Sequence, residues 1–301
     1  MKDLVIIGGG PAAIAASIYA ARKKLDFTVI ARDIGGQTIW AGEVGNYPGF
    51  QLMPGADLAQ KFREHLAQFK FDLREGAEAA KVERAGQNFK VTTGKGETIE
   101  ARTVILATGK RPRLLNVPGE GKFNNKGLTY CATCEGPLFS GKDVAVVGGG
   151  NSALDAAMQL MRYCTKVYLI NNTERLNGDP VMIEKVQASP VVEVLNQAKV
   201  ISFTGDNFLK AVQVELSGEK KDIPVSGVFI EVGLVPNSKC VDFVEKNELG
   251  EIKVNCAAET SVPGLFAAGD VTDGPEKQII IAAGDGAKAL LTAFKYLSTH
   301  K

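Results

Sequence analysis

Short apolar runs that end in a glycine cluster occur at two places in the chain, near residues 8 and 148. Each run has the length of a buried strand, and a helix-compatible stretch and a second apolar run follow the glycines. This order of strand, tight turn, helix and strand predicts an α/β chain with two similar units. The expected elements are strands at 4–7, 27–30, 143–147 and 167–170, with helices at 14–24 and 154–163.

Both glycine clusters have the spacing of a dinucleotide-binding turn. The first glycine of such a turn permits a tight bend, the second lets the backbone approach a pyrophosphate, and a small residue allows close packing of helix on strand. The N–H groups at the start of the helix attract the phosphates. Two copies in the same strand–helix context make a chance cluster a poor explanation. The residues are Gly8, Gly10, Pro11 and Ala12 in the first copy, and Gly148, Gly150, Asn151, Ser152 and Ala153 in the second.

The rest of the pattern predicts further elements. Residues 57–70 are amphipathic and indicate a surface helix, and residues 200–232 alternate like strands. Residues 103–106 predict a buried strand that ends in a turn at Thr108 and Gly109. A long helix is expected over 278–297, and its N-terminal dipole would favour negative charge at its start.

The composition is that of an ordinary globular protein. Of the 301 residues, 45% are apolar and 23% are charged, and the formal net charge is +1. This balance gives no electrostatic reason to expect nucleic acid or an anionic membrane as a partner. No secretory signal opens the chain, and no apolar run approaches the roughly 18 residues of a membrane helix. Five cysteines, an odd number, argue against a secreted disulfide framework, so we expect a cytoplasmic protein.

A pair of cysteines, Cys131 and Cys134, lies between the two glycine clusters. Cysteines at this spacing can form a disulfide, and such a pair exchanges two electrons at a time. A zinc site is the alternative, but zinc takes four ligands and the pair supplies two. Cys164, Cys240 and Cys256 are scattered singly, and we expect them to be buried packing residues. We therefore expect a redox-active pair and no metal.

Two dinucleotide-type turns with a dithiol between them suggest one bound flavin and one exchanging electron carrier. An acid after the second strand of such a unit usually binds the ribose hydroxyls, and Asp33 is the candidate in the first copy, although it comes slightly late. In the second copy the corresponding residues, 171–175, are mostly neutral and end in Glu174 and Arg175. A site for a 2′-phosphate needs arginines there, so NADPH is disfavoured and NADH is permitted.

These motifs together resemble those of the low-molecular-weight thioredoxin reductases, nearly from end to end. The matching segments are 8–12, 35–37, 46–49, 107–109, 131–134, 148–153 and 266–270. The resemblance implies two Rossmann-like dinucleotide-binding domains of the three-layer ββα type, the second inserted in the first. An FAD-binding domain would comprise residues 1–113 and 240–301, and a pyridine-nucleotide domain carrying the cysteines would comprise residues 114–239. A homodimer is also implied.

The same resemblance implies the site residues. Cys131 would attack the disulfide of a thioredoxin- or glutaredoxin-like partner, Cys134 would lie nearer the flavin, and Glu135 would relay a proton. The inserted domain would rotate about linkers near 112–118 and 234–240, because a dithiol beside the flavin cannot also meet a protein. Beyond the two glycine turns, the cofactor-binding residues would be Asp33, Gly36, Gln37, Asn46, Thr108, Gly109, Gly269, Asp270, Lys277, Gln278 and Ile279.

The chain departs from the family pattern in the segment that selects the nucleotide, at the residue after the second cysteine, and near the start of the last helix. Family members that use NADPH carry a His-Arg-Arg run and a later Arg, where this chain has residues 171–173, Asn-Asn-Thr, and Asn177. The second cysteine is usually followed by Asp, here by Glu135. Residues 276–281 are closer to the reductase part of alkyl hydroperoxide reductase flavoproteins, which prefer NADH and carry an additional thioredoxin-like domain at the N-terminus. Because this chain begins at the first glycine turn, we expect a separate protein partner.

We therefore expect a flavoprotein disulfide reductase that passes electrons from NADH, or less favourably NADPH, through FAD and the cysteine pair to a thioredoxin-like protein. One alternative is a dithiol oxidase on the same scaffold, which would pass electrons through flavin to oxygen. Another is a reductase that draws electrons from ferredoxin or another donor. A nucleotide-sensing module with a redox switch is least favoured, because the FAD motifs are complete at both ends of the chain.

Overall fold

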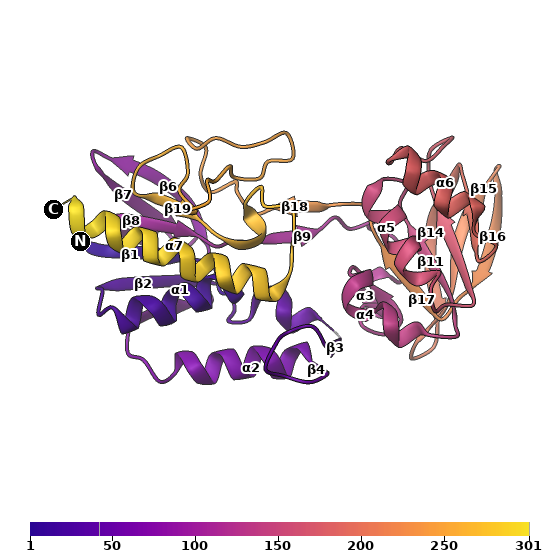
Figure 1. Cartoon of the computed structure of the whole chain (residues 1–301), viewed down its shortest axis with the longest axis horizontal. Coiled ribbons are helices and arrows are strands. Elements are labelled where there is room, and N and C mark those ends of the chain that lie inside the picture. Colours follow the sequence, from indigo (N-terminus) through magenta and orange to yellow (C-terminus); the bar gives the residue numbers. More distant parts are fainter. Residues whose placement is uncertain (42, 301) are drawn as a thin grey trace. The chain divides into compact units, whose positions relative to one another are not determined.

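The computed structural model describes residues 1–41 and 43–300, and the chain divides into two compact units (Figure 1). The first unit comprises Met1–Trp40, Gly45–Arg111 and Val235–Lys301, and the second comprises Ala41–Val44 and Pro112–Leu234. The chain passes between them along β9 (Lys110–Pro112) and β18 (Leu234–Pro236), which pair with each other. Which unit binds which cofactor stays a prediction.

A sheet of mostly parallel strands forms the centre of the first unit. Its strand order is β5-β2-β1-β8-β7-β6, and β19 pairs with β8. The strands β6 and β7 continue the sheet in antiparallel fashion, and the others run parallel. The bounds are β1 (Lys2–Ile7), β2 (Phe27–Ala31), β5 (Asp72–Glu75), β6 (Ala79–Ala85), β7 (Asn88–Thr93), β8 (Thr98–Leu106) and β19 (Leu265–Ala267), with helices α1 (Pro11–Arg22), α2 (Gly55–Leu66) and α7 (Ile279–Thr299).

The alternation of side chains along β1 builds a core on both faces of this sheet. Leu4 and Ile6 pack on one face with residues of α1 and α7, and Val5 and Ile7 pack on the other with residues of β8. The helices α1 and α7 approach closely because Gly286 lies at their contact. A Cβ on that glycine would lie 1.9 Å from the carbonyl oxygen of Ala12.

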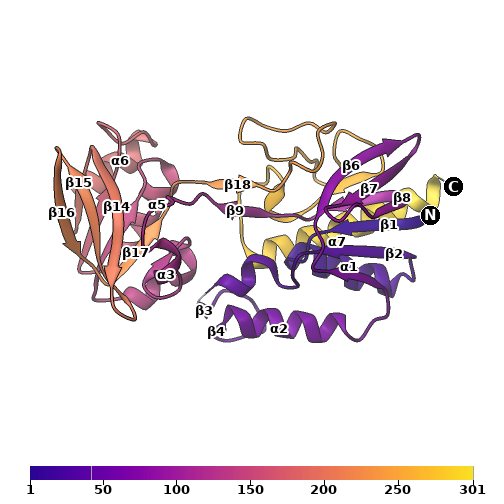
Figure 2. The same cartoon turned by 180° about the vertical axis from the view of Figure 1, so that it is seen from behind.

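The second unit repeats this plan around a parallel sheet of order β10-β17-β11-β12-β13. A separate antiparallel sheet, β14-β15-β16, belongs to the same unit (Figure 2). Its apolar side chains pack into the same core as those of the parallel sheet. The bounds are β10 (Leu128–Thr129), β11 (Asp143–Val147), β12 (Lys166–Ile170), β13 (Val192–Leu195), β14 (Ala198–Gly205), β15 (Leu209–Leu216), β16 (Glu219–Pro224) and β17 (Gly227–Ile230), with helices α5 (Asn151–Leu160) and α6 (Pro180–Ala188). The predicted class, two Rossmann-like α/β units, is confirmed.

Short elements connect these layers. They are η1 (Gly36–Trp40), β3 (Glu43–Val44), β4 (Met53–Pro54), α3 (Glu120–Phe123), α4 (Ala132–Glu135), η2 (Gly136–Phe139) and η3 (Gly269–Val271). The helix expected over 14–24 begins earlier, because Pro11 occupies the first helical turn, where its missing N–H removes no hydrogen bond. The closing helix spans Ile279–Thr299, close to the expectation.

Candidate active site

Loops that are distant in sequence meet at the carboxyl edge of the parallel strands in the first unit. A Cβ on Gly8, where φ is +129°, would lie 2.1 Å from the carbonyl oxygen of Ala107. A Cβ on Gly36 would lie 2.9 Å from the Cα of Gly10. A Cβ on Gly269 would lie 3.0 Å from the Cβ of Ala12, in the first turn of α1. The loops after β2, β8 and β19 therefore all contact the β1–α1 turn.

Polar side chains predicted for cofactor binding lie on these loops. Gln37 Nε2 lies 3.4 Å from Asp270 Oδ2 and 4.0 Å from a Cβ built on Gly109. Asp33 accepts a hydrogen bond from the backbone N–H of Gly36 at 3.0 Å. These contacts join predicted residues from three separate segments of the first unit.

The start of α7 lies at the same edge. Asn46 donates to the side-chain oxygen of Gln278 at 3.0 Å, and Gln278 is the N-cap of α7. Ile279 is the first residue of that helix. The backbone N–H groups of a helix start lack partners within the helix, so this end favours an anionic group.

The residues at this edge fit a phosphate-bearing group such as FAD. Gly10 precedes α1, and a Cβ built there would meet nothing within 4 Å, so the backbone faces open space. Among the described residues, the buried hydroxyls of Thr38 and Thr108 have no hydrogen-bond partner. An unpaired buried polar group costs about 1–3 kcal/mol, which a ligand would remove by pairing with it.

A cluster of buried charges lies behind these loops. Lys110 forms an ion pair with Glu251, and Lys277 Nζ lies 3.5 Å from the same carboxylate. Burial opposes ionisation of Glu251, but hydrogen bonds from Lys110 and Asn247 outweigh it and hold its pKa below the usual value. Burial raises the pKa of Asp270, although Lys277 and Lys110 oppose this rise. Lys277 also donates to the carbonyl oxygen of Thr272 at 2.6 Å.

The second glycine turn joins β11 to α5. A Cβ on Gly148, where φ is +145°, would lie 2.9 Å from the Cβ of Ala153. Glycine at position 148 therefore gives the side chain of Ala153 its room. Asn151 accepts a hydrogen bond from the backbone N–H of Asp179 at 2.7 Å, and Ser152 is exposed on the first turn of the helix. Gly150 is the N-cap of α5. The turn has the close approaches expected of a dinucleotide-binding loop.

The residues that would meet the ribose in this unit follow β12. Asn171 is buried, and its side chain contacts Asn196 at 2.9 Å and the hydroxyl of Thr173 at 2.9 Å. The backbone N–H of Asn177 donates to Gly149 at 2.9 Å, and this bond holds the segment against the glycine turn. Arg175, the basic residue of this segment, is exposed.

Cys131 is the N-cap of the short helix α4 of the second unit, and Cys134 lies within that helix. A disulfide joins Cys131 and Cys134, whose Cα atoms lie 5.3 Å apart. Both cysteines are partly exposed, and the backbone N–H of Cys134 donates to Cys131 Sγ at 3.2 Å. Glu135 is buried, and its backbone N–H donates to the carbonyl oxygen of Cys131 at 3.2 Å.

The structure adds Glu231, a residue to which sequence reasoning gave no role. It follows β17 at the carboxyl edge of the second sheet, and its carboxylate accepts a hydrogen bond from the backbone N–H of Ala132. Burial raises the pKa of Glu231 to about 8; the Ala132 hydrogen bond opposes this rise and the charge of Asp155 adds to it. An acid within the apolar run 227–232 was the available signal.

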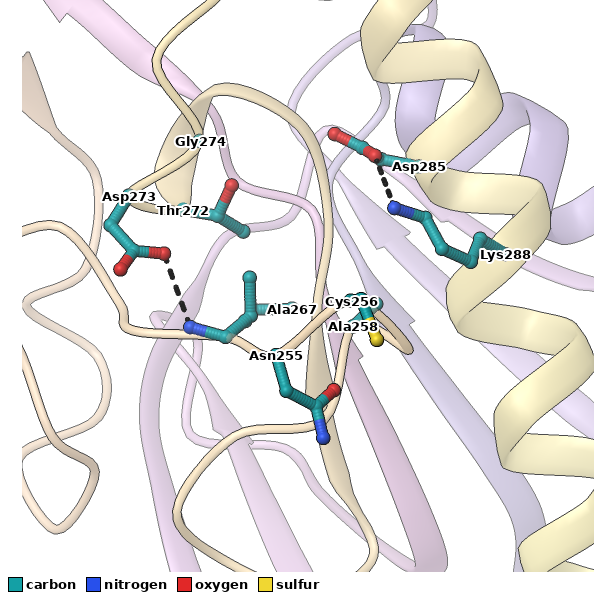
Figure 3. Close-up of a pocket in the computed structure, with 10 residues that line it drawn as sticks. Asn255, Cys256, Ala258, Ala267, Thr272, Asp273, Gly274, Asp285 and Lys288 are labelled. Carbon is teal, nitrogen blue, oxygen red and sulfur yellow. Dashed lines mark hydrogen bonds and ion pairs between the residues drawn. The ribbon is translucent and has the colours of Figure 1, made fainter.

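One expectation about the single cysteines is wrong. Cys164 is buried and Cys240 is partly buried, but Cys256 is exposed. Figure 3 shows Cys256 among the residues that line a cavity. The cavity has a volume of about 340 Å³ and is lined also by Asn255, Asp273, Asp285 and Lys288. Asp285 and Lys288 form an ion pair of 3.0 Å there. This cavity includes no residue of the predicted site.

With this geometry in place, comparisons with known proteins define the class. The model of the pyridine nucleotide-disulphide oxidoreductase family matches residues 2–286. This chain belongs to that family. The family implies FAD and a nicotinamide cofactor.

Individual relatives agree with this assignment. The chain is 40% identical to a subunit of the alkyl hydroperoxide reductase of Staphylococcus epidermidis, over 98% of this chain and 59% of that protein. It is 41% identical to NADH dehydrogenase of Bacillus subtilis, over 98% of this chain and 58% of that protein. It thus spans less than two thirds of these curated relatives. The structure is similar to thioredoxin reductase from Streptococcus pyogenes, with a TM-score of 0.93, 35% identity and 99% coverage of both chains.

Across residues 1–41 and 43–300, no helix is both long and apolar enough to span a membrane. The same residues contain no cluster of three or more His, Cys, Asp or Glu side chains arranged to hold a metal ion.

Proposed function

We propose that this chain passes electrons from NADH through FAD and the Cys131–Cys134 pair to a thioredoxin- or glutaredoxin-like protein. The observation that carries the proposal is the disulfide itself, which lies in the same unit as a second dinucleotide-type turn. The similarity to a thioredoxin reductase over nearly the full length of both chains supports the disulfide as the place where electrons leave.

The first unit is the proposed FAD site. Gly8 and Gly10 would let the backbone approach the pyrophosphate, and the start of α1 would donate N–H groups to it. The hydroxyl of Thr108 is an unused hydrogen-bonding group at the same edge. Bound FAD supplies two-electron redox chemistry, and the start of α7 favours the negative charge that accompanies its reduction.

The neutral character of residues 171–177 supports NADH over NADPH. Asn171 uses its side chain to hold Thr173 and Asn196, so it is committed to the loop and carries no charge. Arg175 supplies one positive charge, whereas a 2′-phosphate is best bound by several. The name of the Bacillus subtilis relative, NADH dehydrogenase, agrees with this preference.

The cysteines have distinct proposed roles. Cys131 attacks the disulfide of the partner protein, and Cys134 resolves the mixed disulfide and lies nearer the flavin. Glu135 relays a proton during this exchange. Each round oxidises the two thiols of the pair to a disulfide and reduces one disulfide of the partner to two thiols, so electrons and atoms balance.

An anaerobic titration of the purified protein tests the electron donor. NADH should bleach the oxidised-flavin absorbance quickly, and NADPH should do so at least tenfold more slowly. Bleaching by a small dithiol but by neither nicotinamide would contradict the proposal and favour the dithiol oxidase. Bleaching by reduced ferredoxin alone would instead identify a ferredoxin-type donor.

Two glycine variants test which unit binds which cofactor. Gly10→Ala places a methyl group in open space, so the fold should persist while flavin content falls. Gly150→Ala brings its Cβ to 3.5 Å from Asn177, an ordinary contact, and should weaken NADH binding while flavin content is unchanged. The opposite pairing of losses would show that the two sites are exchanged.

Cys134→Ser should abolish disulfide turnover and leave flavin reduction by NADH intact.

A homodimer in the cytoplasm completes the proposal. The resemblance to thioredoxin reductases supports both features. Sedimentation at micromolar concentration should give the mass of two chains, and the mass of a single chain would refute the dimer.

A further inference from the structure

Glu231 lies between the two chemically active segments of the second unit. In the parallel pair of β10 and β17, Thr129 is opposite Phe229. Cys131 and Glu231 each come two residues after this last pair. The hydrogen bond from the backbone N–H of Ala132 to the Glu231 carboxylate brings that carboxylate to the peptide group that follows Cys131.

The other neighbour of Glu231 is the second glycine turn. In the pair of β11 and β17, Val147 is opposite Ile230, and the backbone N–H of Glu231 donates to Val147 at 2.8 Å. A Cβ on Gly148 would lie 2.4 Å from the carbonyl oxygen of Glu231. The residue therefore lies at the carboxyl edge of neighbouring parallel strands, where ligands of such sheets bind.

The charges around Glu231 come from two helices. Asp155 on α5 acts on it through space, and α4 contributes the Ala132 N–H and carries the buried Glu135. On the β11 side its neighbours are the uncharged Val147 and Gly148. A carboxyl group in these surroundings keeps its proton at neutral pH, because burial and the like charge of Asp155 both oppose ionisation.

We propose that Glu231 exchanges one proton with Cys131 during each redox cycle. This inference rests on the proposed function in that it assumes a redox-active Cys131–Cys134 pair. Reduction of a disulfide to two thiols takes two electrons and two protons. A hydride equivalent from the nicotinamide would bring both electrons and one of the protons, and Glu231 supplies the other proton to the Cys131 thiolate. The carboxylate takes that proton back when Cys131 attacks the partner disulfide, and solvent protonates the partner thiolate that leaves.

The match of acidities favours this exchange. The pKa of Glu231, about 8, is close to that of an ordinary thiol, about 8.5, so the proton moves between them with little cost in either direction. An ordinary exposed glutamate would be ionised throughout the neutral range and could not donate.

Alkylation of Cys131 tests the proposal without any nicotinamide. We would use the full chain with its flavin in a Cys134→Ser background, and measure the iodoacetamide rate at Cys131 against pH by peptide mass spectrometry, because Cys256 is exposed and also reacts. The background chain should show two ionisations, since an ionised Glu231 disfavours the thiolate beside it. Glu231→Gln should leave one ionisation, and its rate should reach the plateau about one pH unit lower.

Three further variants make the result decisive. Glu219→Gln, an exposed glutamate on β16, should leave both ionisations in place. Glu135→Gln should also leave both ionisations in place. Loss of the second ionisation in Glu135→Gln would overturn the proposal. Persistence of the second ionisation in Glu231→Gln would overturn it as well. If Glu231→Gln fails to fold, Asp155→Asn should move the second ionisation to lower pH, and an unmoved profile would overturn the proposal equally. Failure of NADH to reduce the flavin would refute the donor and leave this result unaffected.

Discussion

The substitution Glu231→Gln should change how the stability of the second unit depends on pH. Burial raises the pKa of Glu231 from 4.5 to about 8 in the folded chain. Below the lower value both the folded and the unfolded chains hold this proton. As the pH rises from there, the unfolded chain releases its proton first, so the folded state loses stability until the pH passes the folded pKa.

The size of this effect follows from the pKa difference. At about 1.4 kcal/mol per pH unit, ionising Glu231 costs on the order of 5 kcal/mol more in the folded chain than in the unfolded one. Glutamine keeps the shape of the side chain and cannot ionise. The free energy of unfolding of Glu231→Gln, minus that of the unaltered chain, should therefore grow by about 1.4 kcal/mol per pH unit across the neutral range and level off above the folded pKa.

Cys164 provides an assay confined to the unit that carries Glu231. It is buried in that unit, so its labelling during a urea titration reports unfolding there. At each pH the labelling time would be set by the rate at which Cys164 of the fully unfolded chain is labelled. Glu219→Gln should show no pH-dependent difference from the unaltered chain. A difference between Glu231→Gln and the unaltered chain that is flat, or that shrinks as pH rises, would refute the assignment of a raised pKa.

Other substitutions test the first unit. Glu251→Gln leaves Lys110 and Lys277 without their shared carboxylate, and should lower the urea-unfolding free energy by about 3 kcal/mol; an unchanged midpoint would contradict this. Gly286→Ala, 1.9 Å from a carbonyl oxygen of α1, should destabilise by about 1–3 kcal/mol. The matched Gly284→Ala, on the same helix with nothing within 4 Å, should stabilise by about 1 kcal/mol, and equal signs would refute the packing argument. Thr108→Val should stabilise the flavin-free chain by about 1 kcal/mol while weakening FAD binding in a fluorescence titration, and unchanged FAD affinity would exclude the proposed contact.

Much of the fold was predictable because its signals are short in range. A glycine turn, the strand before it and the helix after it are neighbours in sequence, and the backbone freedom of Gly8 and Gly148 is needed within that segment. The Cys131–Cys134 disulfide is likewise local, since its spacing alone brings the two sulfur atoms within bonding reach. The same local logic correctly predicted a long helix at the end of the chain.

Other features depend on strand order and on what covers each residue. The contact of Asn46 with Gln278, and that of Gln37 with Asp270, each join residues more than 200 positions apart, so no local pattern reveals them. Cys256 was expected to be buried because free cysteines usually are. It is exposed because it lies beside an open cavity.

The sequence by itself determined the two nucleotide-type turns and the cysteine pair, because backbone sterics and thiol chemistry act over a few residues. Only the tertiary structure decided that the Glu231 carboxylate lies beside the cysteine segment, because the pairing of β10 with β17 brings together two segments about 100 residues apart. The same burial between strands raises the pKa of that carboxyl group into the range where it can exchange a proton. Proximity across a sheet and exclusion of water are properties of the folded chain alone.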